Sequence, residues 1–85
     1  MLKSIAIPSG VSEIGDGTFN WCVSLESIII PNTVTEIGAR AFAWCRDLTM
    51  INYCGTKAEW GNITRAEDWD DIAGEYTVVY SYKPE

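Results

Sequence analysis

The amino-acid sequence predicts a β-rich solenoid, a fold in which short parallel strands stack in successive coils. Three observations predict it: a 23-residue repeat, a strand-forming segment at the start of each copy, and a proline after each of the first two of these segments. A chain of 85 residues has room for one small core, so residues 1–85 are expected to form a single domain.

The repeat is clearest in two adjacent copies. Residues 2–24 (LKSIAIPSGVSEIGDGTFNWCVS) and residues 25–47 (LESIIIPNTVTEIGARAFAWCRD) are identical at 12 of 23 positions. A partial copy follows at 48–55, and residues 56–85 are expected to form a C-terminal cap. One coil cannot bury its apolar side alone, so the copies are expected to stack with equivalent strands paired in parallel at ~4.8 Å.

Each copy begins with a strand pattern in which apolar residues alternate. Alternate side chains of a strand point to opposite faces, so one set is expected to point into the core. That inner set is Leu2, Ile5, Ile7, Leu25, Ile28, Ile30, Leu48, Ile51 and Tyr53. The outward set is Ser4, Ala6, Ser27, Ile29, Met50 and Asn52.

The rest of each copy is expected to return the chain over the core. Pro8 and Pro31 cannot continue a strand ladder and therefore predict a corner. Gly15 and Gly38 predict a second bend that needs an open backbone conformation. The returning side chains are Val11, Ile14, Val34 and Ile37, and those that fill the last side of the coil are Phe19, Cys22, Phe42 and Cys45.

The tail differs in sequence from the repeats. Thr56 and Glu59 fit a capping box that opens a short helix, which turns Trp60 and Ile63 inward and is weakened by Gly61. Residues 64–75 are expected to form a polar loop anchored by two apolar side chains. These anchors are Trp69 and Ile72. Residues 76–82 are rich in aromatic and β-branched types, which predicts a terminal strand that completes the sheet.

Composition excludes several functions. A net charge of −6 argues against nucleic acid and acidic membranes as partners. No apolar run approaches the ~20 residues that cross a bilayer, and the N-terminus does not resemble a signal peptide. The chain has no histidine, so Ser-His and Cys-His nucleophile pairs and histidine metal sites are excluded. We expect no catalysis, no cofactor and no metal.

Trp21 and Trp44 share one repeat position, so stacking would set them side by side. An exposed aromatic pair is a platform for a sugar ring or for an apolar anchor of a partner protein. The alternative is that both rings pack on neighbouring coils. The outward face of the strands is a second candidate binding surface, because exposed Ile29 and Met50 would form an apolar contact patch beside Ser27 and Asn52.

Acidic residues supply weaker candidates. Glu67, Asp68, Asp70 and Asp71 suggest calcium ligands or a glycosidase acid pair, but they lack the spacing of a calcium loop and nothing shapes a cleft around them. A solvated loop is the simpler interpretation. Glu13 and Glu36 share a repeat position, so stacking would bring two like charges together at an outer edge.

The first coil is the exposed end of the predicted stack. Leu2, Ile5 and Ile7 would present an apolar end and an unpaired strand edge to water. We therefore expect self-association through this uncapped coil, unless further repeats cover it.

The pattern LxxIxIPxxVxxIGxxAFxxCxxL resembles the BspA-like, or Treponema pallidum type, leucine-rich repeat, and residues 2–53 fit it well. INYCGTKAEWGNI looks like the end segment that often closes arrays of this family, while Thr18 departs from the family's alanine at that position. The resemblance implies a β-rich leucine-rich repeat solenoid. In that family the repeated cysteine is a small buried hydrophobe, so Cys22 and Cys45 are expected to pack rather than form a disulfide. Cys54 is expected to be a free thiol.

The family resemblance implies a protein-binding or adhesion module of a bacterial surface or secreted protein. Its partner would be a protein, such as a host or matrix protein. A carbohydrate-binding module that uses Trp21 and Trp44 is the first alternative. A purely structural cap of a longer array, with no ligand of its own, is the second. Further 23-residue copies upstream of Met1 would distinguish this last case.

Overall fold

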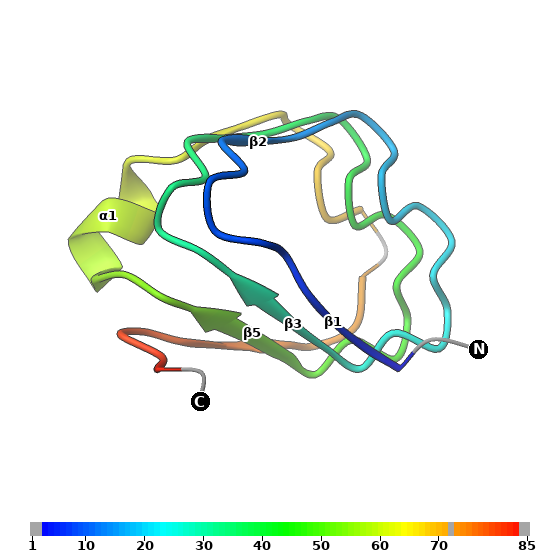
Figure 1. The fold of residues 1–85 in the computed structure, drawn as a ribbon. Coiled ribbons are helices and arrows are strands. Elements are labelled where there is room, and N and C mark those ends of the chain that lie inside the picture. The colour runs from blue at the N-terminus through cyan, green and yellow to red at the C-terminus, as the bar shows by residue number, and fades with distance from the viewer. Residues whose placement is uncertain (1–2, 72, 84–85) are drawn as a thin grey trace.

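Successive coils of the chain stack along one axis in the computed structural model, which describes residues 3–71 and 73–83 (Figure 1). In chain order the elements are β1 (Ser4–Ala6), β2 (Glu13–Ile14), β3 (Ser27–Ile30), β4 (Glu36–Ile37), β5 (Met50–Tyr53), α1 (Lys57–Gly61), β6 (Thr64–Arg65) and β7 (Thr77–Val79). One parallel sheet has the order β1-β3-β5-β7 and a second has the order β2-β4-β6. The predicted β-rich leucine-rich repeat solenoid is confirmed. Below, residues 3–24, 25–47 and 48–71 are called the first, second and third coils.

Strand register follows the 23-residue repeat. Ile5 pairs with Ile28, and Ile28 pairs with Ile51, so identical side chains lie one above another. The expected inner residues of the second and third coils are fully buried, with exposed fractions of 0 or 1%: Leu25, Ile28, Ile30, Leu48, Ile51 and Tyr53. The inner residues of the first coil, Ile5 and Ile7, are only partly buried. Leu2 lies outside the described residues.

β1 and β3 are each followed by a tight turn at proline, as expected. The Val11 N–H donates to the Pro8 carbonyl at 3.3 Å, and the Val34 N–H donates to the Pro31 carbonyl at 3.2 Å. On the far side of the core the Phe19 and Phe42 rings stack with centroids 5.3 Å apart. The apolar core therefore runs as a column through the stacked coils.

The expected reason for Gly15 and Gly38 is wrong. Neither residue has a positive φ, and the left-handed residues of this bend are Gly17 (φ 67°) and Arg40 (φ 56°), which share a repeat position. At Gly38 the constraint is space, because an added Cβ would lie 2.6 Å from the backbone nitrogen of Asp16. Glycine thus allows the second coil to approach the first closely at this bend.

The tail forms the predicted capped helix. The Thr56 side chain accepts a hydrogen bond from the Glu59 N–H at 3.1 Å, and the Glu59 carboxylate accepts one from the Thr56 N–H at 2.9 Å. This capping box satisfies two amides that the helix leaves free. Trp60 and Ile63 are buried, as expected, and the Trp60 ring packs edge-on against Tyr53.

Residues 64–75 were expected to be a loop, and this expectation is wrong at one end. Thr64–Arg65 forms β6, which pairs with β4 in register with Glu36 and Ile37. The path of the third coil therefore continues after the repeat sequence has ended. Trp69 anchors the following segment by edge contacts to three rings, those of Phe42, Trp60 and Tyr76. Ile72 lies outside the described residues.

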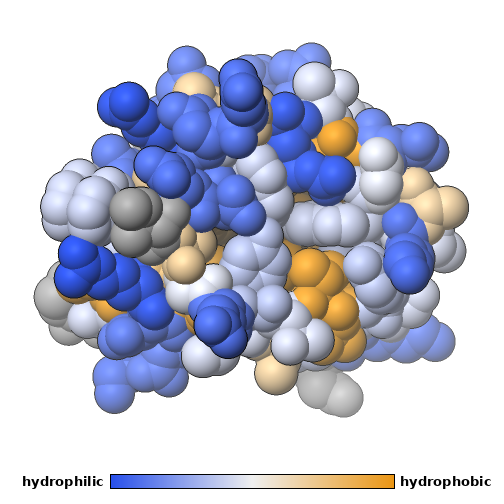
Figure 2. Space-filling model, turned by 180° about the vertical axis from the view of Figure 1, so that it is seen from behind, coloured by the Kyte–Doolittle hydropathy of each residue, from blue (hydrophilic) through white to orange (hydrophobic). Residues whose placement is uncertain are grey.

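The predicted terminal strand is present but shorter than expected. Within 76–82 only Thr77–Val79 is a strand, and it pairs in parallel with β5 and completes the first sheet. Figure 2 shows the molecule from behind, on the side of this last strand, and most of that face is hydrophilic or intermediate. The C-terminal end of the stack is thus more polar than its core, as a capping segment requires.

The same core substitution should lower the free energy of unfolding by different amounts in different coils, because neighbouring coils cover the two positions unequally. Ile28→Val should lower the free energy of unfolding by about 1 kcal/mol, as is typical of a packed core, whereas Ile5→Val should cost less than half as much. The reason is that Ile28 lies between two coils and Ile5 is covered on one side. Urea unfolding at low micromolar concentration measures both values, and equal costs would contradict this account.

Candidate functional site

Trp21 and Trp44 form a stacked pair, as the repeat predicts. Their ring centroids are 4.5 Å apart and their planes differ by 3°. Trp21 is 57% exposed. Among the described residues, Trp21 and Met50 are the exposed large hydrophobic residues, and Trp21 is the more exposed of the two. Trp44 is half-buried, and the Arg46 guanidinium carbon lies 4.8 Å from the centroid of its ring. The pair therefore presents an aromatic surface to solvent from the ring of Trp21.

Both tryptophans have left-handed backbone conformations. The φ angles are 67° at Trp21 and 63° at Trp44, a region that favours glycine or asparagine. The conformation costs a bulky residue roughly 1 kcal/mol or more. The two residues together therefore cost about 2 kcal/mol or more, whereas aromatic stacking of one pair contributes about 0.5 to 1.5 kcal/mol. The stack thus offsets part of the backbone strain, while Trp21 stays 57% exposed.

A polar hollow adjoins the stacked pair. Its volume is about 310 Å³, and its lining residues are Asn20, Trp21, Arg40, Ala43, Trp44 and Asp71. The Asn20 Oδ1 atom is buried and has no hydrogen-bond partner in the part of the chain that the structure describes. Arg40 donates from Nε to Asp68 Oδ2 at 3.3 Å. Aromatic, amide, cationic and anionic groups therefore converge beside Trp21.

The outer face of the strands is the second candidate surface. Ser27 pairs with Met50 and Ile29 pairs with Asn52, so these four residues lie together as the repeat predicts. Met50 is 40% exposed, and Ser27 and Ile29 are half-buried. A shallow hollow of about 300 Å³ lies on this face and includes Tyr82 from the tail.

Asn52 was expected to be exposed on this face, but it is buried. Its exposed fraction is 7%. The last strand pairs Val79 with Asn52, and the Tyr82 N–H then donates to the Tyr53 carbonyl at 2.9 Å. The tail thus covers the end of β5. The exposed residues of the candidate face are therefore Ser4, Ala6 and Met50.

Two residues of the acidic segment make hydrogen bonds within the fold. Asp68 accepts a hydrogen bond from Arg40, and Asp70 Oδ2 accepts one from the Tyr76 hydroxyl at 2.7 Å. Burial, together with this hydrogen bond to Asp70, raises the pKa of Tyr76. Among residues 3–71 and 73–83, no group of three or more acidic or cysteine side chains could hold a metal ion.

The cysteines of the two full repeats lie in adjacent coils. Cys45 is fully buried and its Sγ donates to the Phe19 carbonyl at 3.1 Å, while Cys22 is half-buried. Burial raises the pKa of the Cys45 thiol to about 11. All three thiols, including Cys54, are free. The expected packing role fits Cys45 best.

Glu13 and Glu36 pair in register across β2 and β4, and both are exposed. The predicted edge of like charges is therefore present, with water around it. Thr64 continues the same row in β6.

Several residues of the tryptophan site were not singled out from the sequence. Arg40 takes the repeat position of Gly17, so the change from glycine to arginine was a signal that this position is special. Asn20 precedes Trp21, whereas Ala43 precedes Trp44, and this difference was a second signal. Asp71 was singled out as part of the acidic run, but nothing in the sequence placed it beside the tryptophans, because it lies beyond the repeats.

Comparison with known families agrees with this geometry. Stacked 23-residue coils with two parallel sheets define a repeat solenoid. The family model for the BspA type leucine rich repeat region, which holds six copies, matches residues 1–64. The chain belongs to this leucine-rich repeat family, and the resemblance inferred from the repeats is confirmed.

Searches of curated proteins and of solved structures found no match. Within the described ranges, the longest helix has five residues, far too few to span a bilayer. Of the three comparisons, the family model is therefore the one that identifies relatives of this chain.

Burial predicts unequal reactivity of the three thiols. Cys45 should react with iodoacetamide much more slowly than Cys22 in the folded chain at pH 8, because its thiol is fully buried and its pKa is raised to about 11. A raised pKa also means that this group stabilises the fold below pH ~9 and that this contribution is lost as the pH rises toward 11. Mass spectrometry of timed samples measures the labelling, and equal rates at Cys22 and Cys45 would contradict this assignment.

Proposed function

We propose that this chain is a non-catalytic binding module whose partner is a protein, and that the stacked Trp21–Trp44 pair is its anchor. Leucine-rich repeat proteins commonly bind proteins, and repeat solenoids of this kind are typically non-catalytic. The observation that carries the proposal is the 57% exposure of Trp21 in a stacked pair. Interface hot spots are enriched in tryptophan and arginine, and here Arg46 lies against the Trp44 ring.

Surface chemistry around the pair supports a protein partner with both polar and apolar groups. The hollow beside Trp21 is lined by the polar residue Asn20 and by side chains of both charge signs at Arg40 and Asp71. A hot spot of this form has an aromatic centre and a polar rim. The acidic net charge of the chain would favour a basic partner surface.

The second candidate partner is a glycan. The exposed Trp21 ring favours it, because a sugar ring could stack on this ring while the polar side chains that line the hollow bond to sugar hydroxyls. Soluble glycans that bind in this way should quench or shift tryptophan fluorescence. A protein partner should instead bind regardless of its glycosylation.

Members of the BspA type family are often surface or secreted proteins. We extend this to the chain as part of the same proposal, with adhesion to a host or matrix protein as its role. A matrix-protein array is therefore the first screen for partners.

The tryptophan anchor can be tested by substitution. Binding of the chain to arrays of matrix proteins and glycans should be weakened about 30-fold or more by Trp21→Ala, since loss of a hot spot costs about 2 kcal/mol. Met50→Ala is the matched control, because Met50 is also an exposed hydrophobic side chain but lies on the strand face. Saturable binding that survives Trp21→Ala and is lost in Met50→Ala would move the site to the strands.

A further inference from the structure

Asn62, Ile63 and Thr64 form an Asn-x-Thr triplet, the acceptor sequence for N-glycosylation. It is the one triplet of the type Asn-x-Ser or Asn-x-Thr in the 85 residues. In the other three cases the residue two positions after the asparagine is cysteine or valine. These asparagines are Asn20, Asn32 and Asn52. The serine or threonine hydroxyl is part of the acceptor signal, so Asn62 alone meets the requirement.

The fold places the two ends of this triplet on the surface and its middle residue in the core. Asn62 and Thr64 are exposed, whereas Ile63 is 6% exposed and belongs to the apolar core. Neither the Asn62 nor the Thr64 side chain has a hydrogen-bond partner among the described residues. The Asn62 carboxamide therefore carries no structural contact that a covalent attachment would break.

The backbone of Asn62 is held while its side chain stays open. The Asn62 N–H donates to the Ala58 carbonyl at 3.2 Å and to the Glu59 carbonyl at 3.1 Å, which ends α1. The preceding Gly61 has open space around it, since an added Cβ would meet no atom within 4 Å. A bulky group on the Asn62 side chain can thus extend into solvent without displacing the helix.

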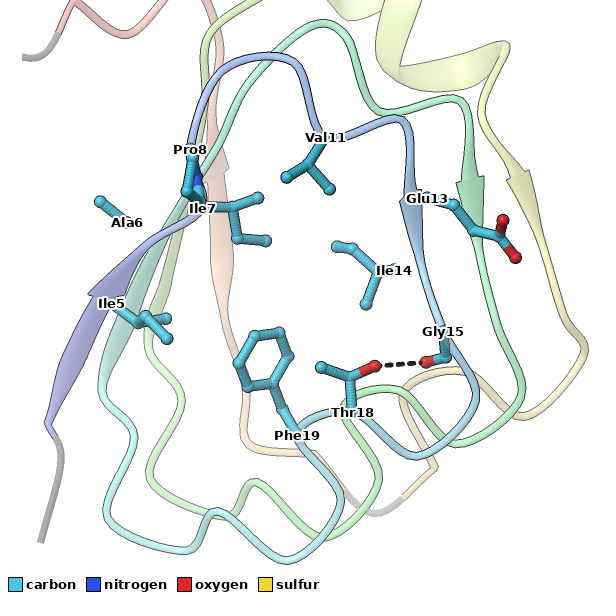
Figure 3. Close-up of a pocket in the computed structure, with 10 residues that line it drawn as sticks. All are labelled: Ile5, Ala6, Ile7, Pro8, Val11, Glu13, Ile14, Gly15, Thr18 and Phe19. Atoms are coloured by element: carbon cyan, nitrogen blue, oxygen red, sulfur yellow. Dashed lines mark hydrogen bonds between the residues drawn. The ribbon is translucent and has the colours of Figure 1, made fainter.

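Thr64 lies on the outer side of the coil because it continues an outward row. Glu13 pairs with Glu36, and Glu36 pairs with Thr64. Figure 3 shows the Glu13 side chain directed away from the interior of the first coil, whereas Val11 and Ile14 point into it. All three residues of the row are exposed. Strand pairing thus keeps the Thr64 hydroxyl on the surface that carries Asn62.

A hollow of about 180 Å³ adjoins Asn62. Its polar lining consists of Asn62 itself together with Asn32, Thr35 and Glu59. Its apolar lining residues are Val34, Tyr53 and Ile63. Amide, hydroxyl and carboxylate groups are hydrogen-bond partners for sugar hydroxyls. The hollow therefore offers contacts to the first sugar of a glycan attached at Asn62.

We propose that Asn62 is an N-glycosylation site. The inference rests on the proposed surface or secreted location, since the chain would meet an oligosaccharyltransferase on that route. The donor is an oligosaccharide carried on a polyprenyl diphosphate. The Asn62 Nδ2 atom forms a bond to the anomeric carbon of the first sugar and releases one proton to the solvent. The bond between that carbon and the diphosphate oxygen breaks, and the polyprenyl diphosphate leaves with the electron pair.

A glycan at this position would leave the tryptophan pair uncovered. Figure 1 shows α1, which directly precedes Asn62, at one side of the coils and residues 18–24 at the opposite side. Trp21 lies within that opposite segment. Glycosylation at Asn62 and protein binding through Trp21 are therefore compatible in one molecule.

Translation of the full chain behind a cleavable signal peptide, in the presence of eukaryotic microsomes, tests the site. The expected result is a single slower-migrating form in the translocated fraction. Peptide N-glycosidase should return this form to the unmodified size and leave aspartate at position 62, which mass spectrometry detects. Asn62→Gln and Thr64→Ala should each abolish the modified form, whereas Thr64→Ser should retain it, because serine keeps the hydroxyl.

Asn32→Gln is the matched control. Asn32 is also exposed and lines the same hollow, but the residue two positions later is Val34. This variant should be glycosylated as the parent chain is. A translocated parent chain without a glycan would overturn the proposal, as would a glycan that persists in Asn62→Gln or in Thr64→Ala.

Folding of the modified chain supplies a second readout. The purified glycosylated chain should unfold cooperatively in urea as the unmodified chain does, and a modified chain that fails to fold would contradict the surface placement of Asn62. The added signal peptide supplies translocation, so the result does not depend on the chain's own route. Binding to matrix proteins through Trp21 is measured separately, so failure of the proposed function and failure of this site are distinguishable.

Discussion

Coverage of each coil by its neighbours is the constraint on which the rest of this structure depends. A single coil of 23 residues has an apolar interior and no second layer of its own, so it becomes a core only when another coil lies on it. The second coil shows the completed state, with Ile28 fully buried between Ile5 and Ile51 and Phe42 fully buried against Phe19 and Trp69. The first coil shows the incomplete state with the same residue types. Packing, strand pairing and hydrogen bonding all change together between them.

The same stacking creates the surface features that carry function. Because equivalent residues align at each coil, an outward tryptophan becomes a stacked pair, and an outward glutamate becomes a row of like charge. An exposed side chain at one repeat position is thus placed next to the equivalent side chain of the neighbouring coil. Its two ends differ, since the tail adds α1, β6 and β7 at one end and nothing described covers the other. The side chains suited to binding therefore lie along the sides of the stack.

Repetition made most of the fold predictable. Ile5, Ile28 and Ile51 share one repeat position, and this alone fixed the register of the main sheet and the proximity of Trp21 and Trp44. The burial of Asn52 could not be predicted in this way, because the segment that covers it lies outside the repeats.

β6 was missed for the same reason: Thr64–Arg65 continues the path of the coil without its sequence. The hollow beside Trp21 was missed because it joins side chains from three coils, including Arg40 and Asp71.

The most direct test of coil coverage compares the backbone amides at two equivalent repeat positions in the dilute chain. Native-state hydrogen exchange should be much slower at Gly38, whose N–H bonds to the Ile14 carbonyl, than at Gly15, whose N–H has no partner among the described residues. Equal protection at the two glycines would contradict the account.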